Sequence, residues 1–139
     1  MRSKRPLLLV EDDQVDAMTV KRAFKEIHIV NRLEIVSNGS EALSFLRNSE
    51  NETPCIILLD LNMPKMNGVE FLKIKNQDEN MRRIPVIVLT TSEEEQDRVS
   101  SFDLGVAGYM VKPVDYRSFV DVVKTIDLYW TLSRLPEGD

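Results

Sequence analysis

Five side chains that could act together in one reaction each stand at the end of a short apolar segment: Glu11, Asp12, Asp60, Thr90 and Lys112. Carboxylates bind hard divalent cations, and a carboxylate can also act as a nucleophile. A hydroxyl and an ammonium group can neutralise and position the oxygens of a phosphoryl group during its transfer. The set therefore has the groups needed for metal-dependent phosphoryl transfer, provided that the fold brings them together.

The charges of this set favour a bound divalent cation. The three carboxylates contribute −3 and Lys112 returns +1, which leaves −2, and clustered carboxylates without compensation are unfavourable. One divalent cation brings the sum to zero. All-oxygen ligands suit Mg²⁺, and the absence of a nearby His or Cys ligand argues against zinc. Asp60 is the candidate nucleophile, which would form an acyl phosphate, with Thr90 and Lys112 beside it.

Alternating strand and helix signals predict an α/β fold. Short apolar segments predict five strands, in the ranges 7–10, 33–36, 54–60, 86–90 and 109–111. Apolar periodicity and capping pairs predict five helices: Gln14 to about His28, one after Asn38, Asn67 to about Asn76, one after Ser92, and one with an apolar face from Phe119 to Trp130. This order predicts a parallel sheet with helices on both faces. The carboxyl ends of its strands share one edge, where such sheets bind ligands.

Composition narrows the class of protein. The 139 residues suit one soluble domain, and a net charge of −5 argues against nucleic-acid binding. The single cysteine, Cys55, allows no internal disulfide, and we interpret it as a small buried side chain. The apolar run at 7–10 is too short for a signal peptide, and no segment is long enough to span a membrane. We therefore expect a cytoplasmic protein.

Four blocks that contain the reactive residues resemble the receiver domain of response regulators in two-component signalling. The blocks are Val10-Glu11-Asp12, Leu58 to Pro64 with Gly68, Pro85 to Thr90, and Tyr109 to Pro113. The resemblance runs from Leu7 to about Trp130. It implies a doubly wound, flavodoxin-like (βα)5 fold with strand order 2-1-3-4-5, and one receiver domain over residues 1–139, with a core of about 6–130 and a tail of 131–139.

The resemblance also implies a mechanism. A histidine kinase would donate a phosphoryl group to Asp60, and Mg²⁺ would be held by Asp12, Asp60 and the backbone carbonyl of Asn62, with Glu11 acting through water. Thr90 would then move toward the phosphoryl group and Tyr109 would turn inward, which would reshape the face made by the fourth helix, fifth strand and fifth helix. The protein would bind a partner or pass the phosphate on. It would not be an enzyme beyond transfer to itself and autodephosphorylation.

Finer details point to one group of receivers. The stretches 89–92, 112–115 and 129–130 are similar to small regulators that are paired with bacterial phytochrome kinases. Thr91 departs from many receivers, which have a smaller residue there, and could narrow access to the phosphoryl group. We interpret His28 as structural or solvated and not as a phosphate donor. If Tyr129 and Trp130 are exposed, they are a candidate homodimer interface.

Three alternatives compete with this interpretation. A pseudo-receiver would bind partners without being phosphorylated. An aspartate-nucleophile phosphatase would need an acid two residues after Asp60, where Asn62 stands. A calcium-binding loop starting at Asp60 is contradicted by Pro64, Lys65 and Phe71, which replace a ligand, the glycine and the bidentate glutamate. With about nine residues after Trp130, we expect no output domain.

Overall fold

The computed structural model describes residues 5–61, 68–90, 104–111 and 115–130. The strands in these residues are β1 Leu7–Val10, β2 Leu33–Val36, β3 Ile56–Asp60, β4 Val86–Thr90 and β5 Gly108–Val111. The helices are α1 Gln14–Glu26, α2 Gly39–Arg47, α3 Gly68–Gln77 and α5 Tyr116–Trp130. None of these four helices has the length and apolar character needed to cross a membrane. The helix predicted after Ser92 falls within 91–103, outside the described residues.

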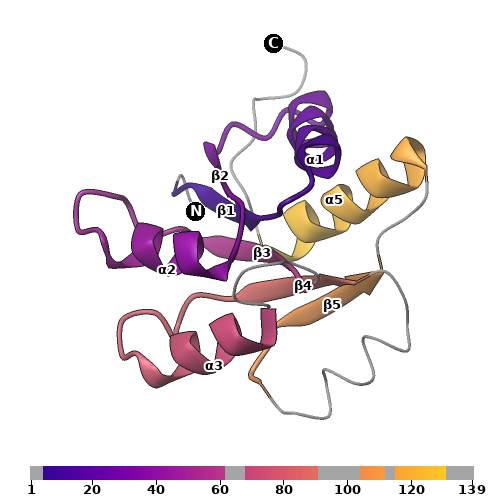
Figure 1. Cartoon of the computed structure of the whole chain (residues 1–139). Coiled ribbons are helices and arrows are strands. Elements are labelled where there is room, and N and C mark those ends of the chain that lie inside the picture. The colour runs from indigo at the N-terminus through magenta and orange to yellow at the C-terminus, as the bar shows by residue number, and fades with distance from the viewer. Residues whose placement is uncertain (1–4, 62–67, 91–103, 112–114, 131–139) are drawn as a thin grey trace.

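The five strands form one parallel sheet in the order β2-β1-β3-β4-β5. This confirms the predicted fold class and strand order. After β1 the chain turns to β2 on one side, and it returns to β3 on the other side of β1 (Figure 1). The connections therefore diverge between the carboxyl ends of β1 and β3, which is where doubly wound sheets leave room for a ligand.

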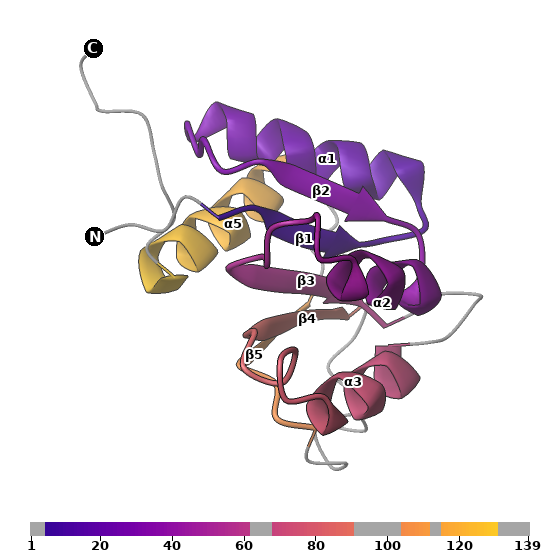
Figure 2. The same cartoon turned by 90° about the vertical axis from the view of Figure 1, so that its left-hand side faces the viewer.

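Helices cover both faces of the sheet. Figures 1 and 2 show α1 and α5 side by side on one face and α2 and α3 on the other. Successive residues of a strand point to opposite faces, so Leu7 and Leu9 of β1 pack in the core under α1 and α5, whereas Leu8 and Val10 pack under α2 and α3. Because β1, β3 and β4 are buried on both faces, their sequences are continuous apolar runs up to the residues at their ends.

The ends of some elements differ from the prediction, and two of these differences have a clear backbone cause. β3 begins at Ile56 and not at Pro54, since proline has no N–H for the sheet ladder. α1 ends at Glu26 and not near His28, because His28 has a φ of 63° and closes the helix in a left-handed conformation. The N–H of Ile29 then donates to the Phe24 carbonyl at 3.0 Å, so the helix is capped by its own backbone.

Candidate functional site

Three carboxylates meet at the carboxyl edge of the sheet. Glu11, Asp12 and Asp60 each offer one oxygen, and these oxygens all lie within 4.8 Å of one another. In the parallel register Val10 lies opposite Leu59, so the residues that follow them, Glu11 and Asp60, leave the sheet side by side. Within the described part of the chain this group contains carboxylates only, which is a donor set that hard divalent cations prefer.

Burial divides this acidic group into two parts. Glu11 and Asp60 are only 3% and 4% exposed, whereas Asp12 is exposed to solvent. Carboxylates held this close repel one another, and the repulsion is stronger where water is excluded. A divalent cation that entered from the side of Asp12 would offset this repulsion. The residues therefore fit a metal ion.

The loop that carries Asp12 is held at both ends. The N–H of Glu11 donates to the Val36 carbonyl at 2.9 Å, which ties the loop to β2. Asp13 then caps α1, because its Oδ1 accepts the N–H groups of Val15 at 2.8 Å and Asp16 at 3.1 Å. The positive end of the α1 dipole consequently lies beside the acidic group. Sequence reasoning missed the role of Asp13, although an aspartate directly before a helix is a known capping signal.

Thr90 ends β4 and is fully buried. Asp60 lies opposite Leu89 in the adjacent strand, and Thr90 lies opposite Val111 of β5. Thr90 therefore stands at the same edge of the sheet as Asp60, one residue further along its own strand. Two other predicted site residues, Lys112 and Asn62, lie outside the described residues.

Tyr109, the predicted switch residue, is half-buried in β5 opposite Val88. It packs against the core cluster under α2 and α3.

Gly68 starts α3 directly behind the acidic group. Its N–H lies 3.5 Å from the Leu61 carbonyl, and a Cβ at this position would lie 3.5 Å from the carbonyl oxygen of Asp60. The sequence motif contains this glycine, but the pattern alone gave no physical reason for it. The reason is the close approach of α3 to the backbone that follows Asp60.

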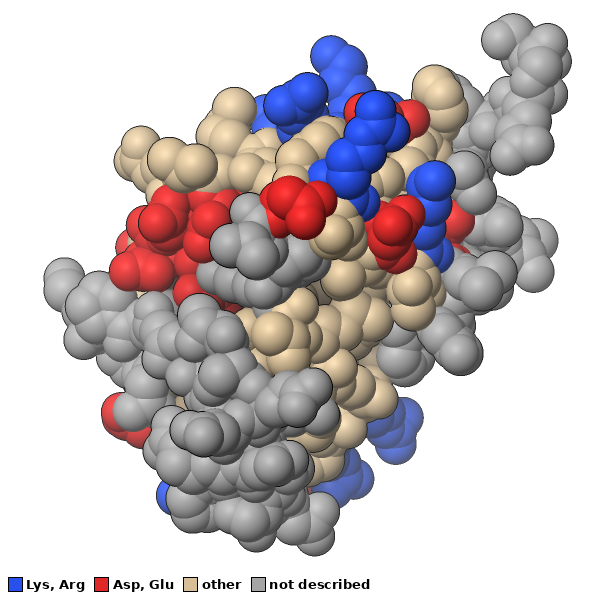
Figure 3. Space-filling model, turned by 90° about the vertical axis from the view of Figure 1, so that its right-hand side faces the viewer, with Lys and Arg blue, Asp and Glu red and all other residues tan. Residues whose placement is uncertain are grey.

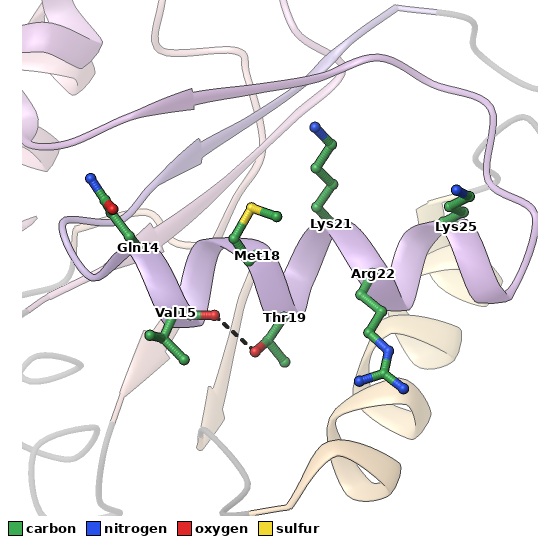
Figure 4. Close-up of a pocket in the computed structure, with 7 residues that line it drawn as sticks. All are labelled: Gln14, Val15, Met18, Thr19, Lys21, Arg22 and Lys25. Atoms are coloured by element: carbon green, nitrogen blue, oxygen red, sulfur yellow. Dashed lines mark hydrogen bonds between the residues drawn. The ribbon is translucent and has the colours of Figure 1, made fainter.

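A hollow of about 720 Å³ runs along the outer side of α1, beginning next to the acidic loop (Figure 4). Val15 and Met18, which are 74% and 60% exposed, form its apolar part. Lys21, Arg22 and Lys25 continue it toward the end of the helix. On this side of the molecule acidic residues gather at one end and basic residues lie further along the same face (Figure 3).

His28 and Cys55 lie away from the acidic group. His28 is exposed and follows the last turn of α1, whose 13 residues extend about 20 Å from the acidic loop. Cys55 is partly buried and stands at the opposite end of β3 from Asp60. Neither residue contributes to the group of carboxylates.

This chain is similar to known proteins along most of its length. Residues 7–124 match the family model of the response regulator receiver domain. The probable methanogenesis regulatory protein FilR2 of Methanothrix harundinacea is 37% identical over 127 residues, which cover 89% of this chain and 82% of FilR2. The response regulator Rcp1 of Synechocystis is 38% identical over 128 residues, which cover 89% of this chain and 87% of Rcp1.

Solved structures agree with these sequence matches. The crystal structure of Mn²⁺-bound Rcp1 superposes with a TM-score of 0.81 and 35% identity, covering 96% of this chain and 100% of that one. The phosphorylated cyanobacterial phytochrome response regulator RcpA superposes with a TM-score of 0.78 and 34% identity, covering 96% of this chain and 99% of that one. The family model spans most of the sequence, and this chain therefore belongs to the response regulator receiver domain family.

Proposed function

We propose that Asp60 accepts a phosphoryl group from a histidine kinase, with Mg²⁺ held by Asp12, Asp60 and the carbonyl of Asn62 and with Glu11 acting through water. The observation that carries this proposal is the convergence of three carboxylates within 4.8 Å at the carboxyl edge of the sheet. The Mn²⁺ in the crystal structure of Rcp1 supports a divalent cation in a close relative. Such an ion, when bound, neutralises charge on the phosphoryl oxygens.

Asp60 is suited to act as the nucleophile. One of its carboxylate oxygens attacks the phosphorus of a phosphohistidine, the P–N bond breaks with its electron pair going to the imidazole, and a proton from solvent completes the free histidine. Thr90 and Lys112 are proposed to bind the phosphoryl oxygens. Beyond this transfer, the only chemistry proposed is hydrolysis of the chain's own acyl phosphate.

The acyl phosphate is proposed to change the face that includes β5. Thr90 of β4 pairs with Val111 of β5, and Tyr109 lies two residues earlier in β5. Movement of Thr90 toward the phosphoryl group would thus act on the strand that holds Tyr109. Tyr109, now half-buried, is proposed to turn inward, and the altered face would bind a partner or allow the phosphate to be passed on.

The kinase is proposed to dock on α1 and to be of the phytochrome type. Val15 and Met18 form an exposed apolar area that begins two residues after the capping Asp13. A donor helix seated there would carry its phosphohistidine to the acidic group. The relationship to RcpA, a phytochrome response regulator, supports the type of kinase. Such signalling would take place in the cytoplasm.

The test is phosphorylation by acetyl phosphate, measured by intact mass, in wild type, Asp60→Asn and the control Asp121→Asn, an exposed aspartate on α5. We expect one added phosphoryl group in wild type and in Asp121→Asn, only with Mg²⁺ or Mn²⁺ present, and none in Asp60→Asn. A folded wild type that binds the cation and yet gains no phosphate from acetyl phosphate or from a kinase would instead support the pseudo-receiver alternative. Phosphorylation of Asp60→Asn at the wild-type level would contradict the assignment of Asp60.

A homodimer is proposed through the end of α5, where Tyr129 and Trp130 stand in the sequence. Phosphorylation would strengthen it through the change in the neighbouring face. Sedimentation velocity of the phosphorylated protein checks this: a species that stays monomeric at high micromolar concentration argues against the dimer without affecting the proposed chemistry.

A further inference from the structure

A second hollow opens at the amino edge of the sheet, at the other end of β3 from Asp60. Its volume is about 380 Å³, which lies in the range of small-molecule pockets. Cys55, directly before β3, lines this hollow, whereas Asp60 ends the same strand. The five residues of β3 separate the two sites by about 16 Å. The hollow is therefore distinct from the acidic group.

The hollow combines an apolar floor with polar walls. Pro54 and Ile84 are buried and Pro85 is partly buried, and all three line it. The exposed side chains of Thr53 and Asn80 add hydrogen-bonding groups. A few polar groups around an apolar surface are typical of sites that orient a small organic ligand.

The charged side chains that line the hollow, among the described residues, are Arg5 and Arg83. Of the acids close by in the sequence, Glu52 faces Arg32 at 4.0 Å, and Asp78 accepts backbone N–H groups of its own turn. Within the described part of the chain no carboxylate forms an ion pair with Arg83. Both charged side chains that line the hollow among the described residues are thus basic, on a protein whose net charge is −5.

Both arginines belong to backbone segments that are held by hydrogen bonds. Arg83 stands in the turn after α3, where Oδ1 of Asp78 accepts the N–H of Asn80 at 2.8 Å. The carbonyl of Arg5 accepts the Asn31 side-chain amide at 2.7 Å. Less backbone entropy is therefore lost when a ligand binds to these side chains.

We propose that this amino-edge hollow binds a small organic anion, whose phosphate or carboxylate is held by Arg5 and Arg83. Guanidinium groups bind such anions through paired, charge-assisted hydrogen bonds. The apolar part of the ligand would cover Pro54, Ile84 and Pro85. This site is independent of the phosphoryl chemistry at Asp60.

The experiment is an NMR titration of the ¹⁵N-labelled protein, without divalent cations, using three probes. Adenosine 5′-monophosphate has both a phosphate group and a nucleoside with a planar base. Inorganic phosphate has only the anionic group, and adenosine has only the nucleoside. We expect saturable shifts at the amides of Thr53, Cys55, Asn80 and Arg83 with the nucleotide, and at least tenfold weaker binding of the other two probes.

Variants decide which residues are responsible. Arg5→Gln and Arg83→Gln should each weaken nucleotide binding at least tenfold, whereas Arg117→Gln, an exposed arginine on α5, should leave it unchanged. Asp60→Asn should bind as wild type does, which separates this inference from the proposed phosphorylation. The proposal is overturned if none of the three probes gives saturable shifts up to about 10 mM. It is also overturned if both arginine variants bind the nucleotide as tightly as wild type does. Equal binding of phosphate or of adenosine would also overturn it.

Discussion

Gly68 approaches Leu61 so closely that a Cβ at Gly68 would lie 2.6 Å from Cδ2 and 3.1 Å from Cα of Leu61. The Leu61 side chain can rotate away from such a contact, but its backbone cannot move without moving Asp60, the residue before it. The start of α3 and the proposed phosphoacceptor are thus mechanically coupled through one residue.

Gly68→Ala is expected to lower both stability and the rate of phosphorylation by acetyl phosphate. The added methyl group overpacks the junction, with a cost of about 1–3 kcal/mol in the free energy of unfolding, and it displaces the backbone next to Asp60. Urea denaturation and intact mass measure the two effects. Gly108→Ala is the matched control, because its Cβ would meet Ile87 at an ordinary 3.9 Å. A Gly68→Ala protein as stable and as reactive as wild type would show that the contact is not restrictive.

Val15→Asn with Met18→Gln is expected to slow phosphorylation by the partner kinase about tenfold or more, since exposed apolar anchors contribute at least about 1–2 kcal/mol to a docking interface. Phosphorylation by acetyl phosphate should not change, because neither side chain belongs to the acidic group. Rates with both donors are measured by intact mass. The control is Val30→Asn, a 49% exposed valine outside the hollow along α1. Equal slowing with both donors would mean that the substitutions damage the site and not the docking.

Lys75→Met is expected to stabilise the protein at neutral pH. Lys75 is only 1% exposed, and its Nζ donates to the Arg82 carbonyl at 3.3 Å. Burial lowers the pKa of Lys75 from its ordinary value of 10.5. Among the described residues no carboxylate forms an ion pair with this ammonium group. Burying such a charge is unfavourable, so methionine should raise the free energy of unfolding by about 1 kcal/mol.

The sign of the pH dependence follows from the lowered pKa of Lys75. Between its folded and unfolded pKa values the unfolded chain binds more protons, so wild type gains stability as the pH rises through this range. The advantage of Lys75→Met should therefore be largest at pH 7 and should shrink as the pH approaches 10.5. Urea denaturation at several pH values checks this, with Lys73→Met, an exposed lysine on the same helix, as control. If the difference in free energy of unfolding between Lys75→Met and wild type stays constant with pH, the buried charge is not its cause.

The sheet was predictable because its central strands are buried on both faces. Continuous apolar runs that end in Asp60 or Thr90 are typical of fully buried strands, and their alternation with helices determines that the strands are parallel. The convergence of Glu11, Asp12 and Asp60 follows from that topology. Strand and helix ends were less predictable, because they depend on single backbone features such as the positive φ of His28.

Features that depend on tertiary contacts could not be predicted. Glu11, Asp12 and Asp13 are three consecutive acids, yet one is buried, one is exposed and one caps a helix. The caps are a different case, because their contacts are local and the sequence does contain the signal: the N–H and hydroxyl of Ser118 donate to Asp115 and lower the pKa of its carboxyl.

Lys75 illustrates the same limit inside a helix. A lysine there is expected at the surface, and only the packing of the turn after α3 explains why this one is buried.

The uniform composition of β3 has a consequence for how the chain finds its correct pairing. From Ile56 to Leu59 all side chains are large, aliphatic and at most 1% exposed, so hydrophobicity barely distinguishes correct pairing from slippage by one position. The residues that do distinguish them are at the ends: Pro54 cannot enter the ladder, and Asp60 pulled one position inward would place a charge in the core at a cost of several kcal/mol. The proposed phosphate acceptor would thus also act as a stop that holds the central strand in its correct frame.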